Sequence, residues 1–232
     1  MGYIIQILSF NDSLWNIYGV IMNRLTEKIF EKAPFGYFTS RDAAVLFPGS
    51  EDRRYALVKR AIANSEIIHI RRGLYCLASK YRKKVNLYAL AQHVYGPSYI
   101  SLESALGWYG WIPEAVYILT SVSLGKSKEF KTPLGVFSYT RVPQKVLYAG
   151  VERQRDEAGD VFLMANPIKA LADYVYIHKK EWTGLKPVAE SLRVEPEEFE
   201  TVLPDYFDGL AENYKSRRVR RFIKGLRKDL EV

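Results

Sequence analysis

The sequence is poor in the residues that hold metals or form cross-links: it has one cysteine and three histidines among 232 residues. A single cysteine, Cys76, excludes a disulfide within the chain and favours a reducing compartment. His69, His93 and His178 are scattered, and none has a second ligand at the spacing of a zinc site. We therefore expect no metal, and we interpret Cys76, which stands in an apolar stretch, as a small buried residue.

Fingerprints of enzymes are also missing. The sequence contains no GxxxxGK[ST], no GxGxxG and no GxSxG. We therefore expect no cofactor and no enzymatic activity. One spacing typical of nucleases does occur, because Glu114 is followed by Glu129 and Lys131, two carboxylates and a lysine that can hold a divalent metal. A metal-dependent nuclease is therefore kept as an alternative, although charged strand ends explain the same short pattern.

Long apolar runs are absent too. No run approaches the roughly 18–20 residues that a membrane-spanning helix needs, so we expect no membrane partner and a cytoplasmic location. The first ten residues are apolar but lack the basic start of a signal peptide, and Asn11-Asp12-Ser13 interrupts them. We interpret them as an extra strand or a flexible extension.

Positive charge is in excess. Lysine and arginine number 34 against 26 acidic residues, which gives a net charge of +8 and a sequence pI near 9.4. This balance favours a polyanionic partner. The hydrophobic content of 48% is that of a folded core, and the length allows one large domain or two small ones.

The clearest pattern lies in residues 38–77. Ser40 is predicted to cap a short helix that Pro48-Gly49 ends, and Ser50 to cap a second helix. The second helix has apolar residues at helical spacing, namely Tyr55, Val58, Ala61 and Ile62. We expect Tyr55 to pack in the core rather than to contact a phosphate.

A change of period follows Asn64. Residues 67–70 and 74–77 read as two strands, and Arg71-Arg72-Gly73 forms the turn between them. A helical pattern over 15–32 precedes the whole segment. Helix, tight turn, basic helix and hairpin is the order of a winged helix-turn-helix domain, predicted here over residues 15–80. Such domains also serve as stand-alone protein-interaction modules, which is a second alternative.

The basic helix and the hairpin tip provide the DNA-binding candidates. A helix about 10–12 Å wide fits the major groove, and a basic hairpin tip reaches the neighbouring backbone or minor groove. Arg53 and Arg54 are expected to face the groove, and Lys59 and Arg60 to contact phosphates. The linker that follows is basic and either extends this surface or is simply solvated. The candidates are Ser50, Arg53, Arg54, Lys59, Arg60, Arg71, Arg72, Lys83 and Lys84.

Residues 85–232 are predicted to form an α+β domain with a small, mainly antiparallel sheet and a helical tail. Helices are expected over 86–95 and 168–179. Strands are expected over 114–122, 129–132, 136–139, and 146–151 paired with 161–165. Asp173 is interpreted as a capping or ion-pair residue rather than a catalyst.

The last predicted helix, over residues 210–230, has an apolar side and is otherwise basic. We call its cations the second basic surface: Arg217, Arg218, Arg220, Arg221 and Lys224. Three interpretations stay open at this point. The surface is the solvated face of a packed helix, a second polyanion contact, or a docking surface for an acidic partner.

Three blocks in sequence order carry a family resemblance. They are FTSRDAAVLFPGSEDRRYALVKRAIANSEIIHIRRGLYCL, then YISLESALGWYGWIPEAVYILTSVSLGKSKEFKTPLGVFSY, then MANPIKALADYVY. Together they resemble the AbiEi-type antitoxins of type IV toxin–antitoxin systems over residues 38–176. The tail after Trp182 matches loosely, and the residues before Trp15 do not match.

The resemblance implies a two-domain transcriptional autoregulator and antitoxin. Its winged helix would bind double-stranded DNA at inverted repeats in its own promoter, and its second domain, residues 85–232, would counteract a cognate nucleotidyltransferase-like toxin. Inverted repeats require two copies of the protein, and these could meet only on DNA, so we expect a monomer or a dimer assembled on DNA. The positions that match the family's basic winged-helix residues are Arg53, Arg54, Lys59, Arg71 and Arg72.

Overall fold

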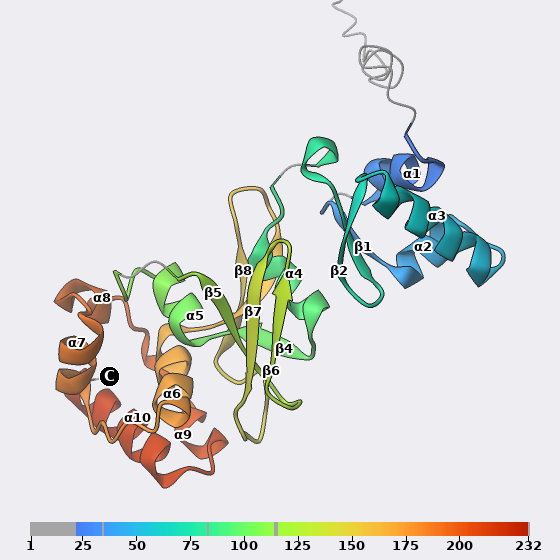
Figure 1. Ribbon diagram of the computed structural model, residues 1–232. Coiled ribbons are helices and arrows are strands. Elements are labelled where there is room, and N and C mark those ends of the chain that lie inside the picture. Colours follow the sequence, from blue (N-terminus) through green and yellow to red (C-terminus); the bar gives the residue numbers. More distant parts are fainter. Residues whose placement is uncertain (1–21, 34, 83, 114–115, 232) are drawn as a thin grey trace, which may run out of the picture. The chain divides into compact units, whose positions relative to one another are not determined.

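The computed structural model describes residues 22–33, 35–82, 84–113 and 116–231 (Figure 1). The chain divides into two compact units. The first comprises Met1–Ile68 and Tyr75–Lys83, and the second comprises His69–Leu74 and Lys84–Val232. The start of the helix predicted from residue 15 lies outside the described residues, as do the candidates Lys83 and Glu114.

The first unit combines helices with a small three-stranded sheet in the order β1-β3-β2. Strands β2 and β3 form the predicted hairpin, whose tip at 69–74 groups with the second unit. In chain order the elements are α1 (Arg24–Lys32), β1 (Tyr37–Thr39), α2 (Ser40–Leu46), α3 (Glu51–Ala63), β2 (Ile67–Arg71), β3 (Leu74–Leu77) and the 3₁₀ turn η1 (Ser79–Tyr81).

Polar side chains fix where these helices begin. Ser50 caps α3 as predicted, because its Oγ accepts a hydrogen bond from the backbone N–H of Arg53 at 3.3 Å. The predicted cap of α2 was wrong by one residue, since Thr39 is the cap and Ser40 is already helical. Thr39 is the cap because it forms two hydrogen bonds with Asp42. The Asp42 carboxylate accepts from the Thr39 backbone N–H at 2.7 Å, and the Asp42 backbone N–H donates to the Thr39 hydroxyl at 3.2 Å.

The core of the first unit contains Leu25 and Ile29 of α1 together with the inner sides of α2, α3 and the sheet. On α3 the prediction was partly wrong, because the side chains of Tyr55 and Ile62 are 65% and 39% exposed. Val58 and Ala61 are the buried residues of that helix. The helix is rotated from the predicted orientation, so its apolar spacing alone did not identify the buried side.

Cys76 lies buried on β3, as predicted. Its Sγ donates to the carbonyl oxygen of Gly36 at 3.1 Å. Burial raises the pKa of the thiol, and the nearby Arg82 only partly opposes that shift. Cys76 is therefore a structural residue that joins β3 to the chain before β1.

The second unit is built on a six-stranded sheet in the order β6-β7-β5-β4-β9-β8. Two pairings are parallel, β5 with β7 and β4 with β9, and three are antiparallel. The sheet is thus larger and more mixed than the small, mainly antiparallel one predicted. The strands are β4 (Ser98–Ile100), β5 (Ile118–Ser123), β6 (Lys128–Thr132), β7 (Gly135–Arg141), β8 (Val151–Arg155) and β9 (Val161–Ala165).

The strand predicted over 146–151 was misplaced, because the partner of β9 is Val151–Arg155. β8 contains the charged residues Glu152, Arg153 and Arg155, and a charged stretch is typical of a loop. β8 is an edge strand, and charges on an edge keep other chains from pairing with it. A charged stretch therefore occurs both in loops and in edge strands, and the sequence alone did not distinguish the two here.

Helices surround this sheet, and α6 is central among them, since α5 and α10 both pack against it (Figure 1). The helix predicted over 210–230 is broken into α9 and α10, because Asn213 and Tyr214 turn inward and Ser216 caps a new helix. The elements are α4 (Leu87–Val94), α5 (Leu102–Trp108), α6 (Pro167–Ile177), α7 (Leu185–Leu192), α8 (Pro196–Glu200), the 3₁₀ turn η2 (Pro204–Phe207), α9 (Leu210–Asn213) and α10 (Arg217–Asp229). Among the described residues, none of these helices combines the length and apolar character of a membrane span.

A buried ion pair lies at the centre of the second unit. Lys169 and Asp173, one turn apart on α6, are fully buried, and their charged atoms are 3.4 Å apart. The hydroxyls of Tyr99 and Ser101 donate to one carboxylate oxygen at 2.8 Å each, and that of Tyr214 donates to the other at 2.6 Å. The Lys169 ammonium also donates to the Tyr214 hydroxyl at 2.7 Å. The prediction that Asp173 is an ion-pair residue is thus confirmed.

Burial dominates the titration of this cluster. It lowers the pKa of Lys169, while the Asp173 carboxylate acts in the opposite direction. It also raises the pKa values of Tyr99 and Tyr214 well above normal, and the same carboxylate adds to that shift. Both phenols therefore stay protonated as donors over the neutral pH range.

We predict that Asp173→Asn lowers the free energy of unfolding of the second unit by about 3–5 kcal/mol, because it leaves the Lys169 charge buried without a counter-charge. Asp205→Asn, at an exposed site, should change it by no more than about 0.5 kcal/mol. Urea denaturation followed by circular dichroism measures both. Equal stabilities of the two variants would contradict the central role of the pair.

Candidate functional site

The turn between α2 and α3 is built by Pro48 and Gly49. Gly49 has a φ angle of +121°, a backbone conformation that residues with a side chain rarely adopt. Arg54 then fastens the turn, because its Nη1 donates to the carbonyl oxygens of Phe47 at 3.3 Å and Gly49 at 2.5 Å. Arg54 is half-buried. At least one of its guanidinium nitrogens thus serves the fold rather than a ligand.

The other cations of α3 point outward. Arg53, Lys59 and Arg60 are exposed. Arg53 and Arg60 are seven residues apart, which places them near one line along the helix. The exposed Tyr55 adds a phenol that can donate to a phosphate oxygen. The structure therefore brings Arg53 and Arg60 together on the outward side of α3, whereas Lys59 is exposed about 100° further around the helix, and the Ser50 hydroxyl is used as the helix cap.

The two hairpin arginines differ. Arg71 is half-buried, and its Nη2 donates to the carbonyl oxygen of His93 at 3.1 Å within the second unit. Arg72 is exposed. The pairing of both arginines at one free tip, as expected from the sequence, is therefore not what the structure presents. Lys84, also exposed, borders a pocket of the second unit.

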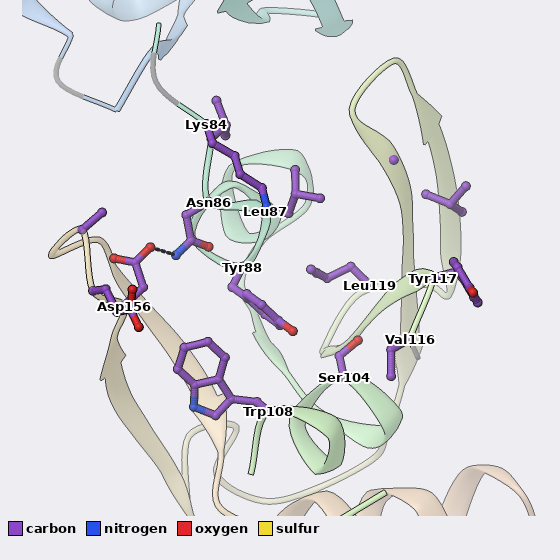
Figure 2. A pocket seen from close by; sticks show the side chains of 15 residues that line it. Lys84, Asn86, Leu87, Tyr88, Ser104, Trp108, Val116, Tyr117, Leu119 and Asp156 are labelled. Carbon is purple, nitrogen blue, oxygen red and sulfur yellow. Dashed lines mark hydrogen bonds between the residues drawn. The ribbon is translucent and has the colours of Figure 1, made fainter. Parts of the chain in front are cut away.

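That pocket, of about 550 Å³, was not anticipated from the sequence (Figure 2). Tyr88 and Trp108 line it together with aliphatic residues such as Leu119, and Figure 2 shows the Tyr88 hydroxyl directed toward its interior. Phe162 lies behind both aromatic rings, with centroids 5.3 Å from Tyr88 and 5.1 Å from Trp108. Trp108 is thus half-buried, with its ring packed against Phe162 on one side and the pocket on the other.

Polar groups at the pocket are largely engaged. The Asn86 side chain donates to a carboxylate oxygen of Asp156 at 2.6 Å, drawn as a dashed line in Figure 2. Desolvation opposes ionisation of Asp156, but this bond and backbone N–H groups outweigh it and lower the pKa. The Ser104 hydroxyl accepts from the Thr120 backbone N–H at 2.7 Å. The arrangement suits binding of an apolar or aromatic group and offers no activated nucleophile among the residues drawn.

A sequence signal for this pocket existed but was ambiguous. Val116, Tyr117 and Ile118 are consecutive apolar residues that are all exposed, and Tyr117 is 90% exposed at the pocket rim. From sequence alone they were assigned to one strand with Glu114. β5 begins only at Ile118. The remaining wall comes from the loop at 156–158, which no local pattern connects with α4.

The alternative nuclease residues lie on the edge strand β6. Glu129 and Lys131 are exposed and form an ion pair at 3.9 Å. Glu114, the third member, falls outside the described residues. Within the described part of the chain, no group of three or more His, Cys, Asp or Glu side chains is placed to hold a metal ion. The nuclease hypothesis stays an untested prediction.

The second basic surface is divided between two roles. Arg218 donates to the carbonyl oxygen of Tyr176 at 3.2 Å and contacts the Glu181 carboxylate at 3.4 Å. Arg221 pairs with the same carboxylate at 2.8 Å. The remaining members of the predicted set are exposed: Arg217, Arg220 and Lys224.

Comparison with known proteins adds no relative: no protein-family model matches the chain, and no curated protein matches its sequence.

The different roles of two adjacent arginines can be measured. We predict that Arg54→Ala lowers the stability of the first unit by about 1–2 kcal/mol, because the turn carbonyls lose a charged donor. Arg53→Ala, at an exposed site, should change stability by less than about 0.5 kcal/mol. Thermal unfolding of the two single variants makes the comparison. A larger loss for Arg53→Ala would show that the assignments are reversed.

Proposed function

We propose that this chain is a DNA-binding transcriptional autoregulator and the antitoxin of a type IV toxin–antitoxin pair. The first unit acts as a winged helix-turn-helix domain. Support comes from its element order, α1-β1-α2-α3-β2-β3, and from the strand order β1-β3-β2, both of which suit that fold. In this proposal α3 is the recognition helix, and the β2–β3 hairpin is the wing.

The observation that carries the DNA-binding part is the exposed basic surface of α3. Arg53 lies near the start of the helix, where recognition helices contact base edges, and its side chain is free of the turn that holds Arg54. Lys59 and Arg60 lie further along and suit phosphate contacts. Arg72 is the wing residue that we propose for the backbone, because Arg71 is held by the His93 carbonyl.

The antitoxin part of the proposal rests on the family resemblance and on where its blocks fall. The second block contributes β4, α5, β5, β6 and β7, and the third block forms α6. Tyr99 and Ser101 from the second block donate to Asp173 of the third. The second and third blocks of the resemblance thus pack against each other within the second unit, which supports treating them as parts of one domain.

We predict that Arg53→Ala with Arg60→Ala weakens binding to duplex from the region upstream of its own gene by at least tenfold. The slope of log affinity against log salt should fall by one to two, at about 0.9 per lost phosphate contact. Gel shift over a salt series measures both. Lys126→Ala with Arg141→Ala removes two exposed cations of the second unit as a control. Indistinguishable affinities of the two double variants would refute the proposal.

The antitoxin activity should be separable from DNA binding. We predict that the Arg53→Ala, Arg60→Ala variant, expressed from an unrelated promoter, still relieves the growth arrest caused by a cognate nucleotidyltransferase-like toxin. Asp173→Asn should fail to do so, because it disrupts the second unit. Growth curves on co-expression give the result. Persistent arrest in the presence of the unaltered chain would eliminate the antitoxin role.

A further inference from the structure

We propose that α10 carries a second, sequence-independent binding surface for duplex DNA. We call it the α10 stripe and define it as Arg217, Arg220, Lys224 and Lys228. This inference does not depend on α3 or on the antitoxin assignment, because the stripe belongs wholly to the second unit. It decides among the three interpretations that the sequence left open for this helix.

The stripe is continuous. Its members follow one another at steps of three, four and four residues, which places them on one side of a helix over about 16 Å. All four are exposed. The described part of the chain supplies no acidic partner to any of them, whereas neighbouring arginines do have one: Arg218 and Arg221 contact Glu181, and Arg227 contacts Asp208.

The opposite side of α10 is apolar and buried. Val219, Phe222, Ile223 and Leu226 are at most 2% exposed and pack into the second unit. Figure 1 shows α10 beside α6 and α9, among the helices of the C-terminal part. No apolar surface of α10 is left for a partner helix or a lipid bilayer. Its charged side is the part that can meet another molecule.

The charges are placed unfavourably for the helix itself. Arg217 lies in the first turn, where a cation opposes the helix dipole. Arg220 with Lys224, and Lys224 with Lys228, are like charges four residues apart, which repel each other. Asp229, at the end of α10, is directed to the start of α7, where its carboxylate accepts from the Leu185 backbone N–H at 2.9 Å. If this side of α10 only faced solvent, the repulsion between these cations would have no compensation. A bound polyanion would neutralise the cations and remove the repulsion.

The chemistry of the stripe selects duplex DNA among polyanions. Its exposed side chains include no aromatic ring, and binding of single strands depends on stacking against such rings. The deep, narrow major groove of an RNA duplex does not admit a helix, but that of B-form DNA does. Protein interfaces are centred on residues that pack into desolvated pockets, whereas all four side chains of the stripe are exposed. Lysine and arginine alone contact phosphates and carry little sequence information.

The test begins with full-length protein that carries Arg53→Ala and Arg60→Ala, so that α3 contributes little. Fluorescence anisotropy with a labelled 20-base-pair duplex of arbitrary sequence gives the affinity between 50 and 200 mM salt. Arg217→Ala, Arg220→Ala, Lys224→Ala and Lys228→Ala are then added together. We expect at least a tenfold loss of affinity at low salt and a salt slope reduced by up to about 3.6, since each of four lost phosphate contacts contributes about 0.9.

A matched control removes four exposed cations elsewhere in the second unit: Lys126, Lys131, Arg141 and Arg153. We expect a loss of no more than about threefold from the general change in charge. Because alanine favours helix and the repulsion is removed, the stripe variant should melt no lower than its parent. Misfolding would therefore not account for its loss of binding.

Two results would overturn the proposal. One is an equal effect of the stripe and control substitutions on affinity and slope. The other is tighter binding to a 20-nucleotide single strand, a 20-base-pair RNA duplex or poly-glutamate than to the DNA duplex, since each would assign the stripe to another class of partner. Loss of sequence-specific operator binding by the α3 substitutions alone bears on the proposed function and leaves this inference unaffected.

Discussion

The buried pair of Lys169 and Asp173 is the interaction on which the second unit depends. Charges without water are tolerated in a protein interior only when other polar groups surround them. Here Tyr99 and Ser101 come from β4 or its end, and Tyr214 comes from the segment before α10. One charged cluster therefore fixes three segments that are distant in the sequence. These segments are β4 with the start of α5, α6, and the stretch that leads into α10.

The first unit is stabilised differently. Its core is apolar, and its polar contacts lie at helix starts and in the turn between α2 and α3. Two kinds of arginine result. Arg54, like Arg71 in the second unit, donates hydrogen bonds to backbone carbonyl oxygens, whereas Arg53 and Arg60 are exposed on α3. Counting basic residues in such a segment overstates the surface that a nucleic acid can meet.

Local chemistry made several elements predictable. Ser50 caps α3 as expected, and the change of period after Asn64 marked the hairpin correctly. Rotation of α3 was not predictable, because Tyr55 and Leu57 are both apolar and only packing decides which of them turns inward. The mixed sheet was missed because β6 and β7 form a hairpin that places β7, not β6, beside β5. The pocket was missed because its walls come from segments about 70 residues apart, such as Asn86 and Asp156.

Arginine footprinting on a DNA complex determines whether the exposed arginines of α3 contact the duplex. The full-length chain is treated with phenylglyoxal with and without upstream duplex, and modification is quantified by mass spectrometry. We predict strong protection of Arg53 and Arg60, with Arg141 and Arg153 modified to the same extent in both samples. Unchanged modification of Arg53 and Arg60 in a saturated complex would contradict it.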